Sequence, residues 1–188
     1  MADSNLTKRA LAGALRELMN EMPFEKITVA DICQRCDMNR KSFYYHFKDK
    51  YDLINWIFDT EFLSVAVARS AEATYDERIV FFEIVCNYFY DNRDFYRKAL
   101  LIKGQNSFSD HFREYVQPIL KNRIAVTLGE DIVDDFTLAF FTDAFICALE
   151  RWLLDKDCMP PRVFVDKLLH IIERSAKVIY ETLKQELE

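Results

Sequence analysis

The sequence predicts an all-α protein, and its composition is the first reason. Its 188 residues include only three glycines and four prolines, whereas a β-rich fold needs such residues in its many turns. Apolar residues also recur at helical spacing along most of the chain. We expect about nine helices, arranged as an N-terminal helix-turn-helix domain of residues 1–55 and a helical domain of residues 56–188.

The first and fourth helices frame the N-terminal domain. Leucines and alanines recur at helical spacing over residues 6–22. Pro23 ends this helix, because proline disfavours a helical conformation in the residue before it. Asp49 is the predicted N-cap of a fourth helix that runs to about residue 69.

The second and third helices lie between them and are separated by very few residues. Thr28 caps the second helix, and Asp31 completes a capping-box pattern. The turn is Asp37-Met38, where Asp tolerates a left-handed backbone. Asn39 caps a third helix that runs through Phe47. Two helices joined by so short a turn predict a helix-turn-helix unit of three helices with the first.

The larger domain has few helix breakers. One helix is expected to begin at Thr74–Asp76, and a second to run from Asp91–Asp94 to Gly104. A third is expected from Phe108 to Thr127, with a kink at Pro118. After Gly129, a fourth is expected from Asp131 to Leu154, and the last runs from Arg162 to Leu187.

The helix of residues 131–154 is apolar on two sides. One side carries Val133, Phe136, Phe140, Ala144 and Cys147, and the other carries Leu138, Phe141, Phe145, Ala148 and Trp152. Because such a helix must be buried on both sides, one side needs a second partner. With the apolar last helix, it predicts a twofold homodimer in which residues 131–154 and 162–187 form a four-helix bundle with their copies.

The net charge of −6 is unevenly distributed. Residues 1–55 hold nine Lys/Arg and eight Asp/Glu, and the remainder holds sixteen and twenty-three. The acidity therefore belongs to the larger domain and does not exclude phosphate contact by the smaller one.

Several classes of protein are excluded. The chain has no glycine-rich nucleotide-binding motif. It has no secretory signal and no apolar run long enough to cross a bilayer, so no membrane partner is expected. Five cysteines without secretory context predict reduced thiols and a cytoplasmic location. No nucleophile-and-base arrangement is present, so an enzyme is not expected.

The third helix carries a basic and aromatic surface that suits double-stranded DNA. A helix in the major groove reads bases with its early residues and contacts phosphates with its flanks. Arg40, Lys41 and Ser42 can reach base edges, because arginine can donate two hydrogen bonds to guanine. Candidate backbone contacts are Thr28, Tyr44, Tyr45, His46 and Lys50. The alternative interpretation is a solvated basic helix whose aromatic residues belong to the core.

Residues 5–55 resemble the DNA-binding domain of the TetR/AcrR family of bacterial transcription regulators. The resemblance rests on the motif Ile27-Thr28-Val29-x-x-Ile32, followed by Asn39-x-x-Ser42-Phe43-Tyr44-Tyr45-His46-Phe47-Lys48-x-Lys50-x-x-Leu53. It implies an all-helical homodimer whose C-terminal domain binds an effector. It also implies base contacts by Arg40, Lys41 and Ser42 and backbone contacts by Thr28, Tyr44, Tyr45, His46 and Lys50. The C-terminal part resembles the subgroup of dihydroxyacetone-kinase regulators.

The chain departs from this family at the turn. Asp37-Met38 stands where the family usually has Gly-Val, and the aspartate brings a negative charge toward the DNA side.

Three pairs of residues are potential metal ligands. Cys33 and Cys36 lack two further ligands at a suitable spacing and are expected to be core residues. His111-x-x-Glu114 and His170-x-x-Glu173 each place two ligands on one helical face, which is too few for a site. Neither a metal nor a cofactor is expected.

Aromatic residues of the C-terminal domain predict either an effector pocket or an ordinary core. The candidate pocket residues are Phe82, Tyr88, Phe89, Phe112, Tyr115, Phe140 and Asp143. Asp143 and Glu150 lie in an apolar helix and would be costly if buried unpaired. They suggest a polar pocket group or a salt bridge with either Arg151 or Arg113.

The function predicted is a ligand-responsive repressor that binds a pseudo-palindromic operator as a homodimer. A small molecule or a protein is expected as its effector. The alternative is a helical protein-interaction or co-regulator module that retains the fold without specific DNA recognition.

Overall fold

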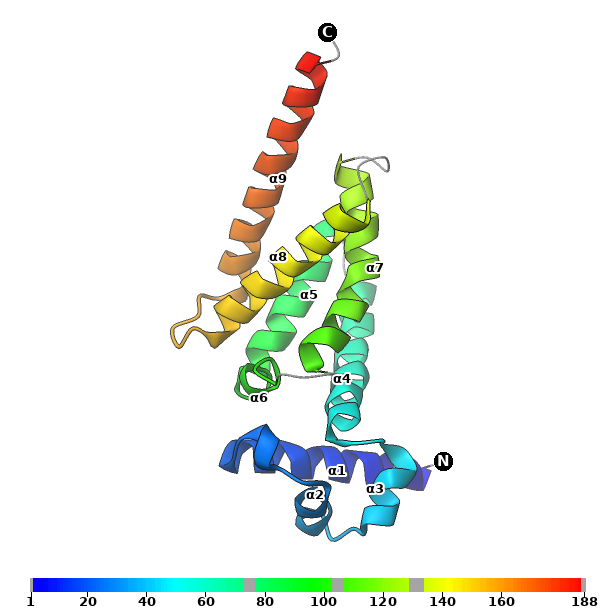
Figure 1. The fold of residues 1–188 in the computed structure, drawn as a ribbon. Coiled ribbons are helices and arrows are strands. Elements are labelled where there is room, and N and C mark those ends of the chain that lie inside the picture. The colour runs from blue at the N-terminus through cyan, green and yellow to red at the C-terminus, as the bar shows by residue number, and fades with distance from the viewer. Residues whose placement is uncertain (1, 73–76, 103–106, 129–133, 187–188) are drawn as a thin grey trace. The chain divides into compact units, whose positions relative to one another are not determined.

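The computed structural model describes residues 2–72, 77–102, 107–128 and 134–186, and every regular element in these ranges is a helix (Figure 1). The elements are α1 (Ala2–Glu21), the short 3-10 helix η1 (Phe24–Lys26), α2 (Val29–Arg35), α3 (Arg40–His46), α4 (Lys50–Glu72), α5 (Glu77–Asp91), α6 (Arg93–Ala99), α7 (Phe108–Leu128), α8 (Asp135–Leu154) and α9 (Pro161–Glu186). The prediction of an all-α fold with about nine helices is confirmed.

Some predicted helix boundaries lie outside the described residues, namely Thr74–Asp76, Gly104, Gly129, Asp131 and Leu187, and so does Val133 of the predicted apolar side. Where α8 is described, it begins at Asp135. The side chain of Asp134 caps it, accepting a hydrogen bond from the Thr137 amide at 2.7 Å. α7 continues through Pro118.

The chain divides into two compact units. Unit 1 comprises residues 1–65 and 92–111, and unit 2 comprises residues 66–91 and 112–188. Both α4 and α7 contribute to both units. A boundary at residue 55 falls inside the continuous helix α4, so the domain limits 1–55 and 56–188 stay a prediction.

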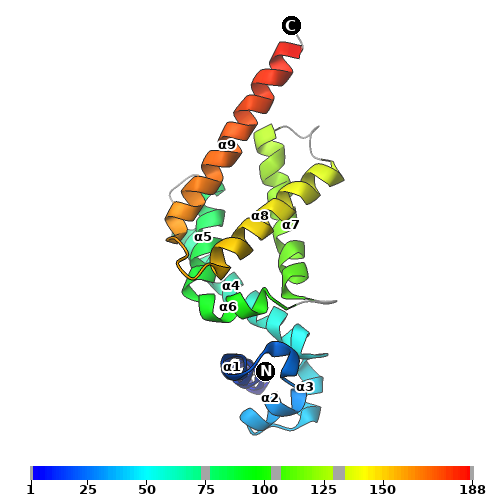
Figure 2. The ribbon, with the colours of Figure 1, turned by 60° about the vertical axis from the view of Figure 1, so that its left-hand side comes forward.

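Unit 1 is built on a three-helix core. α1 packs on α2, and α2 packs on α3; Figure 2 shows these three helices close together beside the N-terminus. Their inward side chains are fully buried, and include Leu11, Leu15, Ile32 and Phe43. Burial of such side chains contributes about 1.5–3 kcal/mol each. This core fixes α3, whose other side remains exposed.

Unit 2 is organised around α5, which packs against α8 and α9. Buried rings hold these elements together: Phe82 contacts Phe145 of α8 at 5.2 Å between centroids, and Phe89 contacts Phe112 of α7 at 5.0 Å. Edge-on pairs of this kind are the favoured geometry for aromatic rings.

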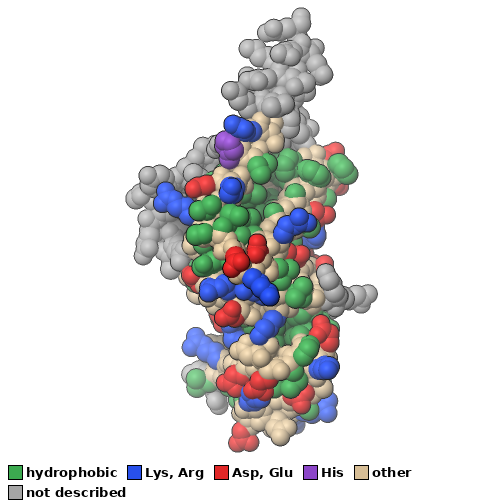
Figure 3. All heavy atoms as spheres, turned by 90° about the vertical axis from the view of Figure 1, so that its left-hand side faces the viewer, with side chains coloured by type: hydrophobic (Ala, Val, Ile, Leu, Met, Phe, Trp, Pro, Cys, Tyr) green, Lys and Arg blue, Asp and Glu red, His purple; other side chains and the backbone are tan. Residues whose placement is uncertain are grey.

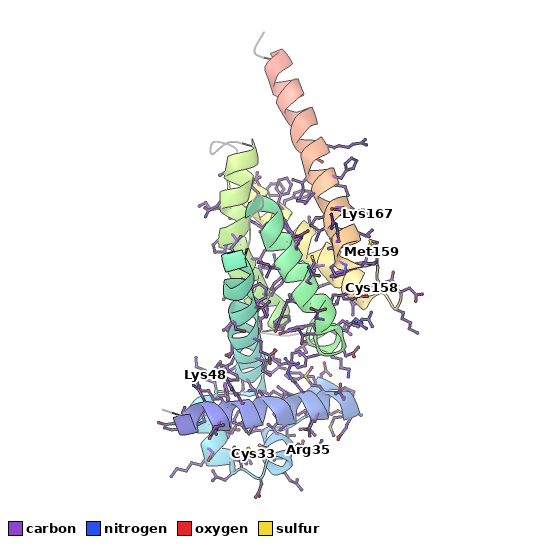
Figure 4. The ribbon with its side chains drawn as sticks, turned by 180° about the vertical axis from the view of Figure 1, so that it is seen from behind. Cys33, Arg35, Lys48, Cys158, Met159 and Lys167 are labelled. Carbon is purple, nitrogen blue, oxygen red and sulfur yellow. The ribbon has the colours of Figure 1, made fainter. Side chains whose placement is uncertain are left out.

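Trp152 at the end of α8 fixes the start of α9. Its indole stacks between Tyr90 of α5 at 6.0 Å and Phe164 of α9 at 4.6 Å. Its Nε1–H also donates to the Met159 carbonyl at 2.8 Å, in the α8–α9 loop labelled in Figure 4. The polar atom of a buried indole is thus satisfied, and the loop is held against the two helices.

Among the described residues, no helix is both long enough and apolar enough to cross a bilayer.

Candidate DNA-reading surface

Side-chain caps fix the two helices of the helix-turn-helix. The Thr28 hydroxyl accepts from the Asp31 amide at 3.2 Å, and the Asp31 carboxylate accepts from the Thr28 amide at 2.8 Å. Hydrogen bonds from Thr28 lower the pKa of Asp31. At the start of α3, the Asn39 side chain accepts from the Ser42 amide at 2.8 Å. Both predicted caps are confirmed, and they set where α2 and α3 begin.

The turn between these helices contains a left-handed residue. Asp37 has a φ of 53°, and among the described residues other than glycine it alone has a positive φ. This confirms the predicted backbone at Asp37, because aspartate is one of the few side chains that adopt this conformation. Its carboxylate is exposed.

α3 has one buried and one exposed side. Phe43 is fully buried, and its ring contacts Phe47 at 5.8 Å. On the opposite side, the exposed fraction is 52% for Tyr44 and 80% for Tyr45. Arg40 and Lys41 are also exposed. Hence the two phenylalanines belong to the core, whereas the tyrosines and basic residues face outward.

The exposed side of α3 borders a hollow of about 280 Å³. The residues that line it each carry a polar group, and they are Thr7, Asn39, Lys41, Ser42, Tyr45 and His46. Hydroxyl, ammonium, amide and imidazole groups therefore converge on one surface, which we call the α3 face together with the adjacent Arg40 and Tyr44. Such groups supply the donors and acceptors that base edges and phosphates require.

Thr7 was not among the predicted site residues. It belongs to α1, and only the packing of α1 beside α3 brings it to the hollow. A lone threonine at the start of a helix carries no sequence signal for this position.

Lys50, a predicted phosphate contact, bonds to the backbone of its own chain in this structure. Its ammonium donates to the backbone carbonyls of Phe24 and Ile27, each at 2.7 Å, and of Glu25 at 3.2 Å. The same nitrogen lies 4.4 Å from the centre of the Phe24 ring. Because an ammonium has three donors, this set accounts for all of them. Lys50 therefore anchors the α1–α2 connection to α4, and its phosphate contact stays a prediction.

α2 is tied to α1 through Arg35. Its guanidinium forms a two-pronged pair with Glu21, at 2.7 and 2.6 Å, and reaches Glu17 at 3.3 Å. Cys33 on the same helix is buried, and burial raises the pKa of its thiol; Figure 4 labels both residues on α2. Cys36 is half-buried, and its thiol donates to the Ile32 carbonyl at 3.3 Å.

The histidines of the two potential ligand pairs lie in different surroundings. His111 Nε2 lies 2.7 Å from the Asp59 carboxylate of α4, and His170 is exposed on α9. Within the described part of the chain, no three His, Cys, Asp or Glu residues are close enough to hold a metal ion.

The predicted effector-pocket residues are not all brought together. Phe82, Tyr88, Phe89 and Phe112 are buried among other aromatic rings, and Tyr115 is half-buried. By contrast, Phe140 is 58% exposed and lies with Asp143 on the outer side of α8. Asp143 forms a salt bridge with Arg113 of α7, which is one of the two salt bridges predicted for it. Phe140 and Asp143 therefore lie on the surface, apart from the buried aromatic rings.

The outer side of α8 is a second exposed surface, which we call the α8 face. It consists of Phe136, Phe140, Asp143, Ala144, Cys147, Arg151 and Leu154. α9 adds exposed Val163, Lys167 and Ile171. Hydrophobic side chains gather among charged ones in the upper half of the surface seen in Figure 3, and Lys167 is labelled on α9 in Figure 4.

Comparisons with known proteins point to one family. The family model described as "Bacterial regulatory proteins, tetR family" matches residues 11–57. The model described as "Transcriptional regulator C-terminal region" matches residues 78–174, just over half of the chain.

A curated relative supports the resemblance to dihydroxyacetone-kinase regulators. The HTH-type dhaKLM operon transcriptional activator DhaS of Lactococcus lactis subsp. lactis (strain IL1403) is 24% identical over 147 residues, which cover 78% of this chain and 74% of the relative.

Solved structures share the fold. A TetR transcriptional regulator from Streptococcus agalactiae 2603V has a TM-score of 0.72 at 23% identity, with 92% of this chain and 96% of that chain covered. Dihydroxyacetone kinase operon activator DhaS has a TM-score of 0.58 at 18% identity, covering 92% and 97%. RolR in complex with resorcinol also has a TM-score of 0.58 at 18% identity, with 95% of this chain and 94% of that chain covered.

The matched models account for both the helix-turn-helix region and the helical C-terminal region, and the described fold agrees with them. The function of this family is the regulation of transcription and not catalysis. The chain belongs to the TetR family of bacterial transcriptional regulators.

Proposed function

We propose that this regulator binds a pseudo-palindromic operator as a homodimer and that an effector controls the binding. The observation that carries the proposal is the α3 face, where polar groups from α1 and α3 surround one hollow on the outside of a helix whose apolar residues are buried. This arrangement is what a helix inserted into the major groove requires.

Base contacts are assigned to Arg40, Lys41 and Ser42 at the exposed start of α3. The fork of arginine suits guanine, and a lysine or serine beside it can reach a neighbouring base. Backbone contacts are assigned to Thr28, Tyr44, Tyr45 and His46.

Two copies of the chain would meet through the α8 face and α9. Large, exposed apolar side chains such as Phe136 and Phe140 favour burial against a partner. A twofold dimer would present two α3 faces to half-sites about 34–36 Å apart. An effector that binds the C-terminal helices, and binds one dimer geometry better than the other, would change this spacing.

The effector is proposed to bind unit 2, as a small molecule or a protein. Buried aromatic rings around Phe89 and Phe112 support an apolar ligand. The cytoplasm, where bacterial DNA is found, is the corresponding location.

Enrichment of duplexes from a random-sequence library by the full-length protein tests this function. The enriched duplex should bind less tightly at higher salt, because bound phosphates release counterions. Arg40→Ala should weaken binding by about 1–3 kcal/mol, which is about 5- to 150-fold. Lys121→Ala is the matched control, since Lys121 is exposed on α7 and loses the same charge.

The failure to enrich any duplex, or equal binding by the Arg40 variant, would favour the alternative interaction module. The direction of control is decided separately. The sequence predicts a repressor, whereas the curated relative is named an activator. A reporter gene placed behind the enriched duplex should fall in expression when the protein is present if the chain represses, and rise if it activates.

A further inference from the structure

Helix α6 belongs to the same compact unit as the helix-turn-helix, although α5 just before it belongs to the other unit. The chain crosses between the units after Val65, after Asp91 and after His111. Residues 92–111 therefore form an excursion into unit 1 that is flanked on both sides by unit 2.

Arg16 of α1 contacts two other helices at once. Its Nη2 lies 2.5 Å from the Glu61 carboxylate of α4. Its guanidinium carbon lies 4.2 Å from the centre of the Phe95 ring of α6. Only a planar cation can stack on a ring with its face and pair with a carboxylate through its edge, so lysine could not make both contacts.

A second contact lies one turn farther along both helices. Lys98 Nζ of α6 donates to the Asn20 side chain of α1 at 2.8 Å. Asn20 follows Arg16 by four residues, and Lys98 follows Phe95 by three, so the two contacts lie along one line. Two points of attachment fix the rotation of α6 about its axis as well as its distance from α1.

α4 holds the other side of this excursion. The fully buried Phe58 ring lies 6.4 Å from Tyr96 of α6 and 5.4 Å from Phe108 at the start of α7. Asp59 pairs with His111 at 2.7 Å. Residues 92–111 are thus fastened to α1 by polar contacts and to α4 by aromatic packing.

We propose that Arg16 is a positioning residue for operator binding, which it serves by fixing α6 to the helix-turn-helix. This inference rests on the proposed operator-binding function. Because α6 follows α5 after the single residue Asn92, the attachment makes α6, with α4 and α7, a connection that sets the orientation of the α3 face in the dimer. Without Arg16, α6 is loosened and the two α3 faces are less firmly held at one spacing.

The test compares Arg16→Met with wild type on three duplexes: the library-enriched operator, its isolated half-site, and the operator with one base pair inserted between the half-sites. Arg16→Met should weaken binding to the full operator by about tenfold. Half-site affinity should stay within about twofold of wild type, and the penalty for the inserted base pair should shrink. Lys26→Met, at an exposed position of η1, is the charge-matched control and should leave the penalty unchanged.

Two further variants separate the contacts of Arg16. Arg16→Lys keeps a charge for Glu61 but loses the stacking, and Phe95→Leu keeps apolar packing but removes the ring. Each should resemble Arg16→Met in direction, and the double variant Arg16→Met/Phe95→Leu should be no worse than either single one, because they act on one contact. Circular dichroism must show all variants folded at the assay temperature.

The inference is overturned if Arg16→Met binds the full operator and its lengthened form like wild type, or if it loses half-site affinity as much as full-site affinity. Amide hydrogen exchange of the DNA-free protein supplies a readout that does not need an operator. Exchange should accelerate in residues 93–102 of Arg16→Met and stay unchanged in α2 and α3. Unchanged exchange in residues 93–102 would also overturn it, whereas failure to enrich any duplex would count against the proposed function alone.

Discussion

The α3 face and the α8 face are both exposed and both carry aromatic rings, but their chemistry differs. On α3 the exposed rings are those of Tyr44 and Tyr45, which end in hydroxyl groups and lie beside Lys41. On α8 they are those of Phe136, at 77% exposure, and Phe140, which contain only carbon and hydrogen. A tyrosine can stay hydrated while it contacts a wet, polar nucleic acid, whereas a phenylalanine gains mainly from a dry interface.

The charges of the two faces follow the same division. Arg40 and Lys41 project from α3 into solvent and offer positive charge to phosphates. On α8 the charge of Asp143 is already paired with Arg113 of the same unit. The comparison teaches that exposure alone does not identify a site, because the polar groups on an exposed ring and its neighbours decide which partner it suits.

Phe140→Asp should have the largest effect, because it attacks the apolar face in both copies of a twofold dimer. Burial of one phenylalanine contributes about 1.5–3 kcal/mol, and symmetry doubles the loss. The dissociation constant of the dimer should therefore rise by about 10²- to 10⁴-fold. Sedimentation velocity over a range of protein concentrations measures this directly.

Leu101→Asp provides the control for that change, since Leu101 is a similarly exposed apolar side chain in unit 1. It should leave the sedimentation of the protein unchanged. If the Phe140→Asp protein sediments like wild type at micromolar concentration, the α8 face is not the dimer interface.

Short-range patterns of the sequence predicted most of the fold. Capping at Thr28 and Asn39 and the left-handed Asp37 depend on neighbours within three or four residues, so the sequence contains what determines them. The two apolar sides of α8 were also visible as helical periodicity. Which side faces the protein was not, because periodicity does not distinguish an inner face from an outer one.

Long-range contacts explain what the sequence did not reveal. Lys50 bonds to carbonyls 23 to 26 residues away, and nothing next to it in the sequence marks that connection. Thr7 reaches the hollow only because α1 packs beside α3. Phe140 was grouped with buried rings by residue type, whereas its exposure depends on how α8 is rotated.

Lys50→Met tests whether this lysine serves the fold or the DNA. Loss of a charged donor from three backbone carbonyls, two of them part-buried, should lower the free energy of unfolding by about 2 kcal/mol. Urea denaturation measures this change. Lys48→Met is the matched control, because Lys48 is exposed and labelled in Figure 4 on the α3–α4 connection, and it should change stability little.

The same variant distinguishes a structural role from the originally predicted phosphate contact. Removal of a phosphate contact would reduce the slope of log affinity against log salt by about one per site. We expect an unchanged slope for Lys50→Met. A stable Lys50→Met protein with a reduced slope would restore the phosphate contact.

Thr28→Ala should lower the free energy of unfolding by about 1 kcal/mol, because it removes the N-cap of α2. Thr28→Ser retains the hydroxyl and should be close to wild type. The pKa of Asp31 is lowered by hydrogen bonds from Thr28, so their contribution is complete above the ordinary pKa of a carboxyl and is lost as pH falls through the lowered value. The difference in stability between Thr28→Ala and wild type should therefore narrow in acid, and the part that comes from the bond between the Asp31 amide and the Thr28 hydroxyl should remain. A difference that does not change with pH would contradict a contribution from the Asp31 carboxylate.

Asp37→Asn should have the smallest effect, and it concerns a negative charge beside the positive α3 face. Asparagine keeps the left-handed backbone of the turn and removes the charge. Operator affinity should therefore rise about two- to fivefold at low salt, and the gain should fade as salt screens the phosphates. Fluorescence anisotropy at several salt concentrations measures the gain, and Asp37→Gly should reproduce it because glycine also accepts a φ of 53°. Weaker binding of both variants at every salt concentration would mean that Asp37 accepts a hydrogen bond from a cytosine amino group, and the α3 face would then extend into the turn.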